Sequence, residues 1–249
     1  MKIRRWIGTG ILITLLGTGI TVIASTQLDF NEEIKKTFMD PTLEEKSLEL
    51  EEVKKIYFSG SAETLKICYT EDQNLFHYYE GKHMTYDIDY NKEEQTLRVV
   101  QNYKVHFGFS LIDTSVLYIH NALDELVLDV NAANVCLDKI NISNLDIKVS
   151  AGNLELNQVT ASTSTLEANA GNIKMKDTIF DTVAMKLNAG NLTFQGDILQ
   201  TGRIQADLGN MTLHLNREEE AYTINGLGNG KTSITYDVSL GNQTILYKK

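Results

Sequence analysis

Hydrophobic and polar residues alternate along most of the second half of the chain. Apolar residues occupy every second position in 126–130, 145–149 and 183–187, and a shorter alternating pair follows each of these runs. Alternation with a period of two predicts β-strands that bury one face. The chain therefore reads as a series of short strand pairs.

A short phrase with glycine and asparagine separates the two strands of each pair. It reads Ser-Ala-Gly-Asn at 150–153 and Asn-Ala-Gly-Asn at 169–172 and 188–191, and it returns every 19 residues. Glycine supplies the positive φ that a tight corner needs, and asparagine tolerates it. A fixed period of this length indicates stacked repeats. The predicted repeat corners are Asn134, Gly152, Asn153, Gly171, Asn172, Gly190, Asn191, Gly209, Asn210, Gly228 and Asn229.

Two architectures can use such a unit: a meander of antiparallel hairpins, or a solenoid whose coils stack in parallel. The outward position five residues before each asparagine favours the solenoid, because stacking at about 4.8 Å would place opposite charges next to one another. That position reads Asp129, Lys148, Glu167, Lys186 and Gln205. The asparagines would stack as an amide ladder along one corner. We predict an all-β fold, a single-stack β-solenoid resembling a parallel β-helix with 19-residue coils.

The predicted solenoid domain, 54–249, has less regular ends. Residues 54–105 contain strand-like runs without the repeat, regular repeats cover about 106–230, and 231–249 form a C-terminal cap. Thr96 and Ser115 fall at 19-residue steps before Asn134, so the solenoid is expected to start near Thr96, with the preceding strands covering its end. Leu-Gly-Asn recurs at 240–242, less than a full repeat after Asn229, as a half coil or a cap strand.

The N-terminal region predicts a membrane anchor. Residues 1–5 are a basic cytoplasmic stub, 6–24 are 19 uncharged residues, and 25–53 are a charged stalk or linker. A helix of 19 residues spans roughly 28 Å, close to the thickness of the hydrocarbon core. Basic residues before it place the N-terminus in the cytoplasm and the C-terminal domain outside the cell. A cleaved signal peptide is the alternative, although the apolar run is long for one.

Composition narrows the classes of partner. The net charge is −10, with 33 acidic against 23 basic residues, which argues against nucleic acid as a partner. The two cysteines, Cys68 and Cys136, fit neither a disulfide framework nor a metal site. Cys136 takes the outward position of Glu155 in the next repeat, so we interpret it as a surface residue.

Catalytic and cofactor motifs are not found in the sequence. The five histidines are scattered, and the Gly-Asn-Gly at 228–230 lacks the directly following Lys-Ser/Thr of a phosphate-binding loop. The corners carry Asn and no repeated Asp, unlike calcium-binding solenoids. We therefore expect no catalytic residue, no metal site and no cofactor.

The strands before the repeats, the repeated Ala-Gly-Asn followed by alternating aliphatic residues, and the N-terminal helix together resemble a bacterial family. It is a family of exported β-strand-repeat proteins that have been proposed to be adhesins. Their shared domain has no known function and occurs in envelope proteins of Gram-positive bacteria. The resemblance covers roughly Lys54 to Tyr247, with Gly-Asn at the corners where family members more often show Gly-Asp. It implies a surface-exposed, non-enzymatic accessory of the cell envelope.

Three functions remain open from the sequence. The first is a membrane-anchored extracellular protein that binds an envelope protein, a wall polymer or a host surface, in an adhesion or envelope-stress role. The second is a carbohydrate-active β-helix acting on wall or extracellular polysaccharide, which requires carboxylates and a base gathered along one face. The third is an inert spacer that holds another molecule off the membrane.

Overall fold

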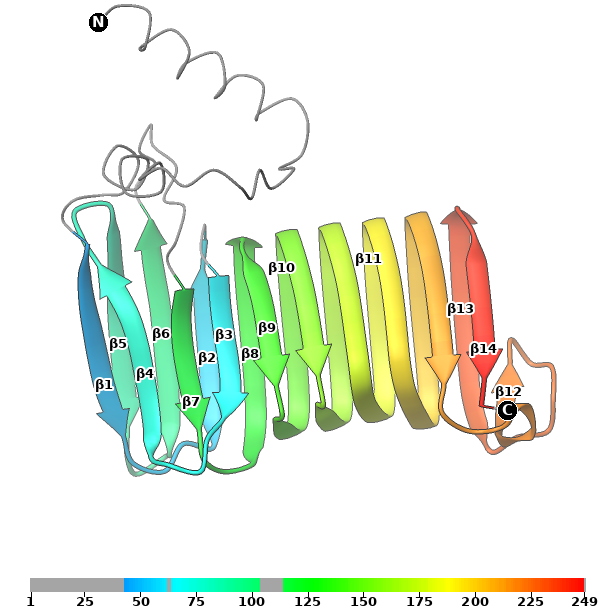
Figure 1. Cartoon of the computed structure of the whole chain (residues 1–249), viewed down its shortest axis with the longest axis horizontal. Coiled ribbons are helices and arrows are strands. Elements are labelled where there is room, and N and C mark those ends of the chain that lie inside the picture. Colours follow the sequence, from blue (N-terminus) through cyan, green and yellow to red (C-terminus); the bar gives the residue numbers. More distant parts are fainter. Residues whose placement is uncertain (1–42, 62–63, 104–113, 249) are drawn as a thin grey trace, which may run out of the picture. The chain divides into compact units, whose positions relative to one another are not determined.

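The computed structural model describes residues 43–61, 64–103 and 114–248. This part of the chain is all-β, with one 3-10 turn, η1, at Glu219–Ala221 (Figure 1), so the predicted all-β class is confirmed. The strands of its first part are β1 (Glu44–Leu50), β2 (Lys55–Gly60), β3 (Thr64–Tyr69), β4 (Asn74–Glu80), β5 (Met84–Asn91), β6 (Thr96–Tyr103) and β7 (Thr114–Ile119). They are followed by β8 (Leu123–Ala132), β9 (Asn134–Asp138), β10 (Asn141–Asn157), β11 (Thr160–Leu215), β12 (Tyr222–Ile224), β13 (Thr232–Leu240) and β14 (Gln243–Tyr247).

The middle of the chain is a stack of parallel coils. β10 pairs in parallel with β8, β9 and β11, and every pair joins residues 19 positions apart, as Ile147 does with Leu128 and Leu166. β11 continues through its corners and winds through almost three coils in its 56 residues. The parallel register confirms the solenoid for this region and excludes the meander of hairpins there.

Each regular coil consists of two strand rows that face one another across the core. Alternate residues point inward and are almost fully buried, for example Leu128, Ile147 and Leu166 at 0–1% exposure. The Ala-Gly-Asn corner closes one end of the coil, and a second residue with positive φ closes the other. This second bend falls at Lys139, Gln158 and Asp177, with φ of 50–57°. The 19-residue period is thus two strands plus two bends.

The coil order breaks at the N-terminal end of the stack. β2 lies between β6 and β8 in one row, and β3 lies between β7 and β9 in the other, all in parallel. The coil at 55–69 therefore lies between the coil at 96–119 and the coil formed by β8 and β9, although it comes first in the chain. The expectation that the solenoid runs directly from Thr96 to Asn134 is wrong, because Thr96 pairs with Lys55 in one row and Ser115 with Leu65 in the other.

Three antiparallel strands lie outside the stack at this end. β5 pairs with β6, while β4 pairs with β7 and β1 pairs with β4 (Figure 1). The predicted stalk, 25–53, is wrong for its last part, because Glu44–Leu50 forms β1. Its glutamate, lysine and leucine residues favour a helix in isolation, but Leu48 and Leu50 pack against the core through β4, and this tertiary pairing decides the conformation.

The C-terminal end of the stack is one further coil after an insertion. β13 and β14 pair in parallel with β11, as Ile245 does with Leu213, and this step along the chain is longer than the 19-residue period. The added segment leaves the coil after Leu215 and contains η1 and the short β12. Leu-Gly-Asn at 240–242 is therefore the corner of a complete last coil.

The predicted stub (1–5) and membrane anchor (6–24) lie outside the described residues. Within the described part of the chain, we find no helix of the length and hydrophobicity needed to cross a membrane.

Candidate functional site

The asparagine corners form one hydrogen-bonded ladder. The side-chain Nδ2 of Asn153 donates to Oδ1 of Asn134 at 2.9 Å, and the same bond joins each successive pair as far as Asn210 at 3.0–3.1 Å. The preceding glycines, Gly152, Gly171, Gly190 and Gly209, have φ of 136–140°. A Cβ on Gly171 would lie 1.5 Å from the carbonyl oxygen of Gly152, so only glycine fits. These predicted residues therefore have a structural role.

Gly228 and Asn229 do not belong to the ladder, which corrects the last predicted corner. Both lie in the inserted segment, and Asn242 takes the next place by donating its backbone N–H to Oδ1 of Asn210 at 3.2 Å. Gly241 stacks on Gly209 in the same way as the inner glycines stack on one another. Because of the insertion, the last corner comes later in the sequence, but it still stacks directly on the preceding corner.

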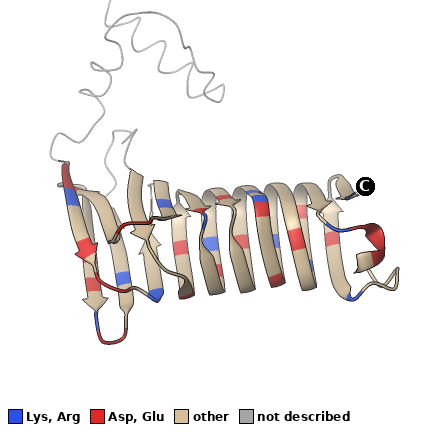
Figure 2. Ribbon diagram, turned by 60° about the horizontal axis from the view of Figure 1, so that its bottom comes forward, with Lys and Arg blue, Asp and Glu red and all other residues tan. Residues whose placement is uncertain are grey.

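The outer surface of the regular coils carries interspersed charges (Figure 2). Lys148 lies between Asp129 and Glu167 on neighbouring strands, as the alternating ladder predicted. Lys174 and Glu155 form an exposed ion pair at 3.6 Å. Pairs of this kind satisfy each other in solvent and contribute little energy. Charges of opposite sign thus alternate along this row of outward positions.

The two cysteines are free thiols on neighbouring strands. Cys136 is half-buried and pairs with Glu155, as its predicted outward position requires, whereas Cys68 is buried. Burial raises the pKa of both thiols. A raised pKa lowers the thiolate fraction, and the thiolate is the reactive form.

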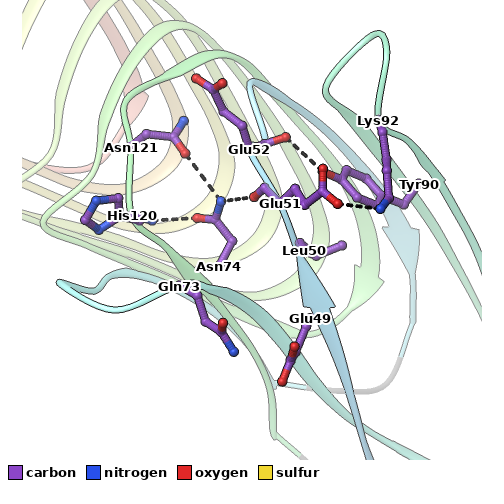
Figure 3. Close-up of a pocket in the computed structure, with 10 residues that line it drawn as sticks. All are labelled: Glu49, Leu50, Glu51, Glu52, Gln73, Asn74, Tyr90, Lys92, His120 and Asn121. Carbon is purple, nitrogen blue, oxygen red and sulfur yellow. Dashed lines mark hydrogen bonds and ion pairs between the residues drawn. The ribbon is translucent and has the colours of Figure 1, made fainter.

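A hollow of about 610 Å³ lies where the coil order breaks (Figure 3). Four connections meet there: β1 to β2, β3 to β4, β5 to β6, and β7 to β8. Because β2 lies between β6 and β8, the chain that leaves β7 must pass the start of β2 before it enters β8. At this crossing, Asp124 donates its backbone N–H to the Lys54 carbonyl at 2.8 Å. The lining residues are Glu49, Leu50, Glu51, Glu52, Gln73, Asn74, Tyr90, Lys92, His120 and Asn121.

Buried Asn74 ties the connections together beneath the hollow. Its Nδ2 donates to the backbone carbonyl of Glu51, and its Oδ1 accepts the backbone N–H of His120 at 2.7 Å. Asn121 continues the network by donating to the Val53 carbonyl at 2.7 Å. A side-chain amide has both a donor and an acceptor, so it can link two backbone segments that do not pair with each other. The floor of the hollow is thus fixed by hydrogen bonds.

The rim of the hollow carries charged and aromatic groups. Lys92 and Glu51 form an ion pair at 2.5 Å, and this bond raises the pKa of the lysine. The Tyr90 hydroxyl donates to the Glu52 carbonyl at 3.0 Å, and burial raises the pKa of this phenol. Glu49 is exposed and forms no ion pair within the described residues. The rim can form hydrogen bonds and ion pairs with a ligand.

His120 is the one histidine that lines this hollow. Its ring stacks on Tyr69 with centroids 6.4 Å apart, and its Nδ1 lies 3.2 Å from the Thr70 carbonyl oxygen. Within the described part of the chain, the polar contact of this imidazole is thus a carbonyl, which is not a nucleophile that it could activate. Within the described residues, no three metal-ligating side chains come together.

A second hollow of about 650 Å³ adjoins the first through Gln73. It lies on the outer face of β4 and β7 and is lined by Thr70, Asp72, Gln73, Leu75, His77 and Tyr118. His77 forms an ion pair with Glu45 on β1 at 3.2 Å when protonated. The two hollows give the irregular end a continuous polar and aromatic surface.

Comparison with known proteins identifies the family. The toastrack DUF4097 family matches residues 53–240. The chain belongs to this family. The resemblance to exported β-strand-repeat proteins is therefore confirmed. Among curated proteins, no match was found.

Several solved structures are similar to this chain at low sequence identity. A proposed adhesin from Parabacteroides distasonis is 14% identical, with a TM-score of 0.46, covering 84% of this chain and 98% of its own. One from Bacteroides fragilis is 12% identical, with a TM-score of 0.41, covering 83% and 98%. A proposed cell adhesion protein from Clostridium sporogenes is 13% identical, with a TM-score of 0.36, covering 83% and 100%. At these identities and scores, the likenesses say nothing about what this chain binds.

The residues of the hollow were not singled out by the sequence pattern. Asn74 begins β4 and Asn121 follows β7, and asparagine is common at such strand ends. His120 counted only as one of five scattered histidines. These residues meet because β2 and β3 lie between the coil at 96–119 and the coil formed by β8 and β9. The 19-residue period does not indicate that these coils stack in a different order from their order in the sequence.

Proposed function

We propose that this toastrack protein is an extracellular binding module, anchored in the cell membrane by residues 6–24, and that it acts without catalysis. Its partner is an envelope protein or a wall polymer, held at the hollow of the irregular end. Residues 1–5 stay in the cytoplasm in this proposal, and the described domain lies outside the cell.

The observation that carries the proposal is the construction of the hollow. Its floor consists of four connections, and buried Asn74, at the end of one of them, bonds two others at Glu51 and His120, while exposed side chains such as Glu49 and Gln73 stand at its rim. A rigid floor with free polar groups around it is typical of a preformed binding site. The regular coils differ, because much of their outward charge is matched by the neighbouring coil.

Affinity capture from solubilised membranes tests the proposal. The full-length chain in detergent is the bait, and purified wall polymers are tested in parallel. We expect one membrane protein or one polymer to be retained by the parent chain. Glu49→Lys reverses a charge at the rim and should reduce retention at least tenfold, equivalent to about 1.4 kcal/mol.

A matched control keeps the result specific. Glu219→Lys makes the same charge change at an exposed site on η1, at the other end of the coil stack, and should leave retention unchanged. Equal loss in both variants would show an effect of net charge and contradict a site at the hollow. Shortening of the polymer during incubation would instead support the carbohydrate-active alternative.

A further inference from the structure

The last coil presents an open strand edge. Within the described residues, β14 pairs with β11 on one side only, and β13 is covered on its outer side only by the short β12. Asn225 adds a side-chain cover by bonding both the N–H and the carbonyl of Tyr236, at 2.8 and 3.3 Å. The backbone of 243–247 has no such cover within the described part of the chain. An unpaired edge of this kind is a template for another strand.

The side chains of this coil are less buried than their equivalents one coil inward. Leu213 and Leu215 are 0% and 2% exposed, but their partners Ile245 and Tyr247 are only half-buried. On the outward face, Leu246 is 46% exposed. The end of the core is therefore incompletely covered at β14.

The charge pattern distinguishes this edge from the one at the opposite end of the stack. Residues 239–247 contain no charged side chain, whereas β1 contains Glu44, Glu45, Lys46 and Glu49. Like charges that face each other across a strand pair are destabilising, and proteins commonly protect edges in this way. The β1 edge thus carries charged side chains of the kind that protect an edge, and the β14 edge carries none.

We propose that β14 binds β14 of a second copy of this chain, as an antiparallel pair centred on Ile245. In this register Ile245 meets its own copy, and Gln243 meets Tyr247 on the inward side. Thr244 meets Leu246 on the outward side, so the exposed leucine is covered. The pair is self-complementary, as a two-fold symmetric interface requires. It lies away from the hollow, which stays free to bind its partner.

Sedimentation of the full-length chain in detergent, over a range of concentrations, tests this pairing. We expect a monomer–dimer equilibrium that Leu246→Lys shifts at least tenfold toward the monomer. His214→Lys is the matched control, because His214 pairs with Leu246 one coil inward and lies within the stack. It should leave the equilibrium unchanged.

Two outcomes would overturn the proposal. One is a monomer at every concentration, and the other is a dimer that Leu246→Lys does not weaken, as association through the N-terminal segment would give. Cross-linking provides a second test that does not depend on the lysine variant. Thr244→Cys combined with Leu246→Cys should yield a disulfide-linked dimer on mild oxidation, and the parent chain with its own two cysteines should not. Failure of the double variant to cross-link would contradict the register.

Discussion

Tyr222 donates a hydrogen bond of 2.6 Å to Oδ1 of Asp197, and it does so from inside the inserted segment. Asp197 occupies a buried bend position that is Ile140, Val159 and Thr178 in the three preceding coils. The Arg217 Nε lies 2.6 Å from the other carboxylate oxygen. A buried carboxylate needs such partners. The insertion therefore supplies a guanidinium that pairs with this carboxylate and a hydroxyl that donates a hydrogen bond to it.

This contact predicts a loss of stability at alkaline pH. Burial, followed by the hydrogen bond to Asp197, raises the pKa of Tyr222 from 10.0 to about 12. The neutral phenol is therefore favoured in the folded state, and its contribution is fully present below pH 10 and lost as the pH rises toward 12. The loss in unfolding free energy amounts to roughly 2 to 3 kcal/mol.

Denaturant unfolding of the parent chain and of Tyr222→Phe between pH 9 and pH 12 checks this effect. Other tyrosines and the lysines titrate in both proteins, so only the difference between the two curves reports Tyr222. We expect the difference to shrink as the pH rises. Parallel curves would contradict the assignment.

Removal of one buried hydroxyl should stabilise the solenoid. Ser164 is 2% exposed at a position held by Leu145 in the preceding coil, and its Oγ has no hydrogen-bond partner among the described residues. An unsatisfied buried hydroxyl costs about 1 to 3 kcal/mol. Ser164→Ala should raise the unfolding free energy by about 1 kcal/mol in a denaturant titration.

Ser115 provides the opposite case. It is equally buried, but its Oγ lies 2.9 Å from the hydroxyl of Tyr86. Ser115→Ala leaves that hydroxyl with one bond fewer and should lower the unfolding free energy by about 1 kcal/mol. If both alanine variants changed stability in the same direction, hydrogen bonding would not explain either effect.

The corner glycines should resist any side chain. Gly171→Ala would force a Cβ to within 1.5 Å of the Gly152 carbonyl oxygen at a φ of 140°. Backbone displacement in a regular coil should cost about 3 kcal/mol or more. Gly226→Ala is the control, because Gly226 also has a positive φ, of 81°, but meets no atom within 4 Å. It should lose only about 1 kcal/mol in thermal or denaturant unfolding; similar losses in both variants would contradict a steric cause.

The floor of the hollow should depend on the amide of Asn74. Asn74→Asp keeps the acceptor for the His120 N–H but loses the donor to the Glu51 carbonyl, and it buries a charge. We expect a loss of about 2 kcal/mol in unfolding free energy at neutral pH. Asn141→Asp makes the same change on an exposed residue that pairs with uncharged Thr160, and it should alter stability by less than about 0.5 kcal/mol. Equal effects would show that the amide network is not important.

The regular repeats could be predicted from the sequence because the same physical constraint recurs in every coil. Each corner needs glycine for close stacking and asparagine for the ladder, so Asn153 and Asn172 specify their coils directly. The end of the series was misread at Asn229, because Gly-Leu-Gly-Asn keeps the 19-residue spacing by coincidence, while the ladder continues to Asn242. The short corner motif alone does not show which of its copies stacks on the preceding corner.

The hollow could not be predicted, because it results from long-range pairing. Thr96 and Ser115 also keep the 19-residue spacing, yet β2 lies between β6 and β8. Alternating residues in β2 suit either neighbour, so hydrophobic pattern alone does not decide the order of the coils. The exchange of order places Asn74 and Asn121 together, and it creates the proposed binding site.

Photo-crosslinking in intact cells tests the central claim most directly. A photoreactive residue replaces Gln73 at the rim of the hollow, and the control places it at Thr193, an exposed outward position on a regular coil. We predict one discrete adduct from position 73 that Glu49→Lys abolishes, and none from position 193. No adduct at position 73, or the same adducts from both positions, would contradict a binding function at the hollow.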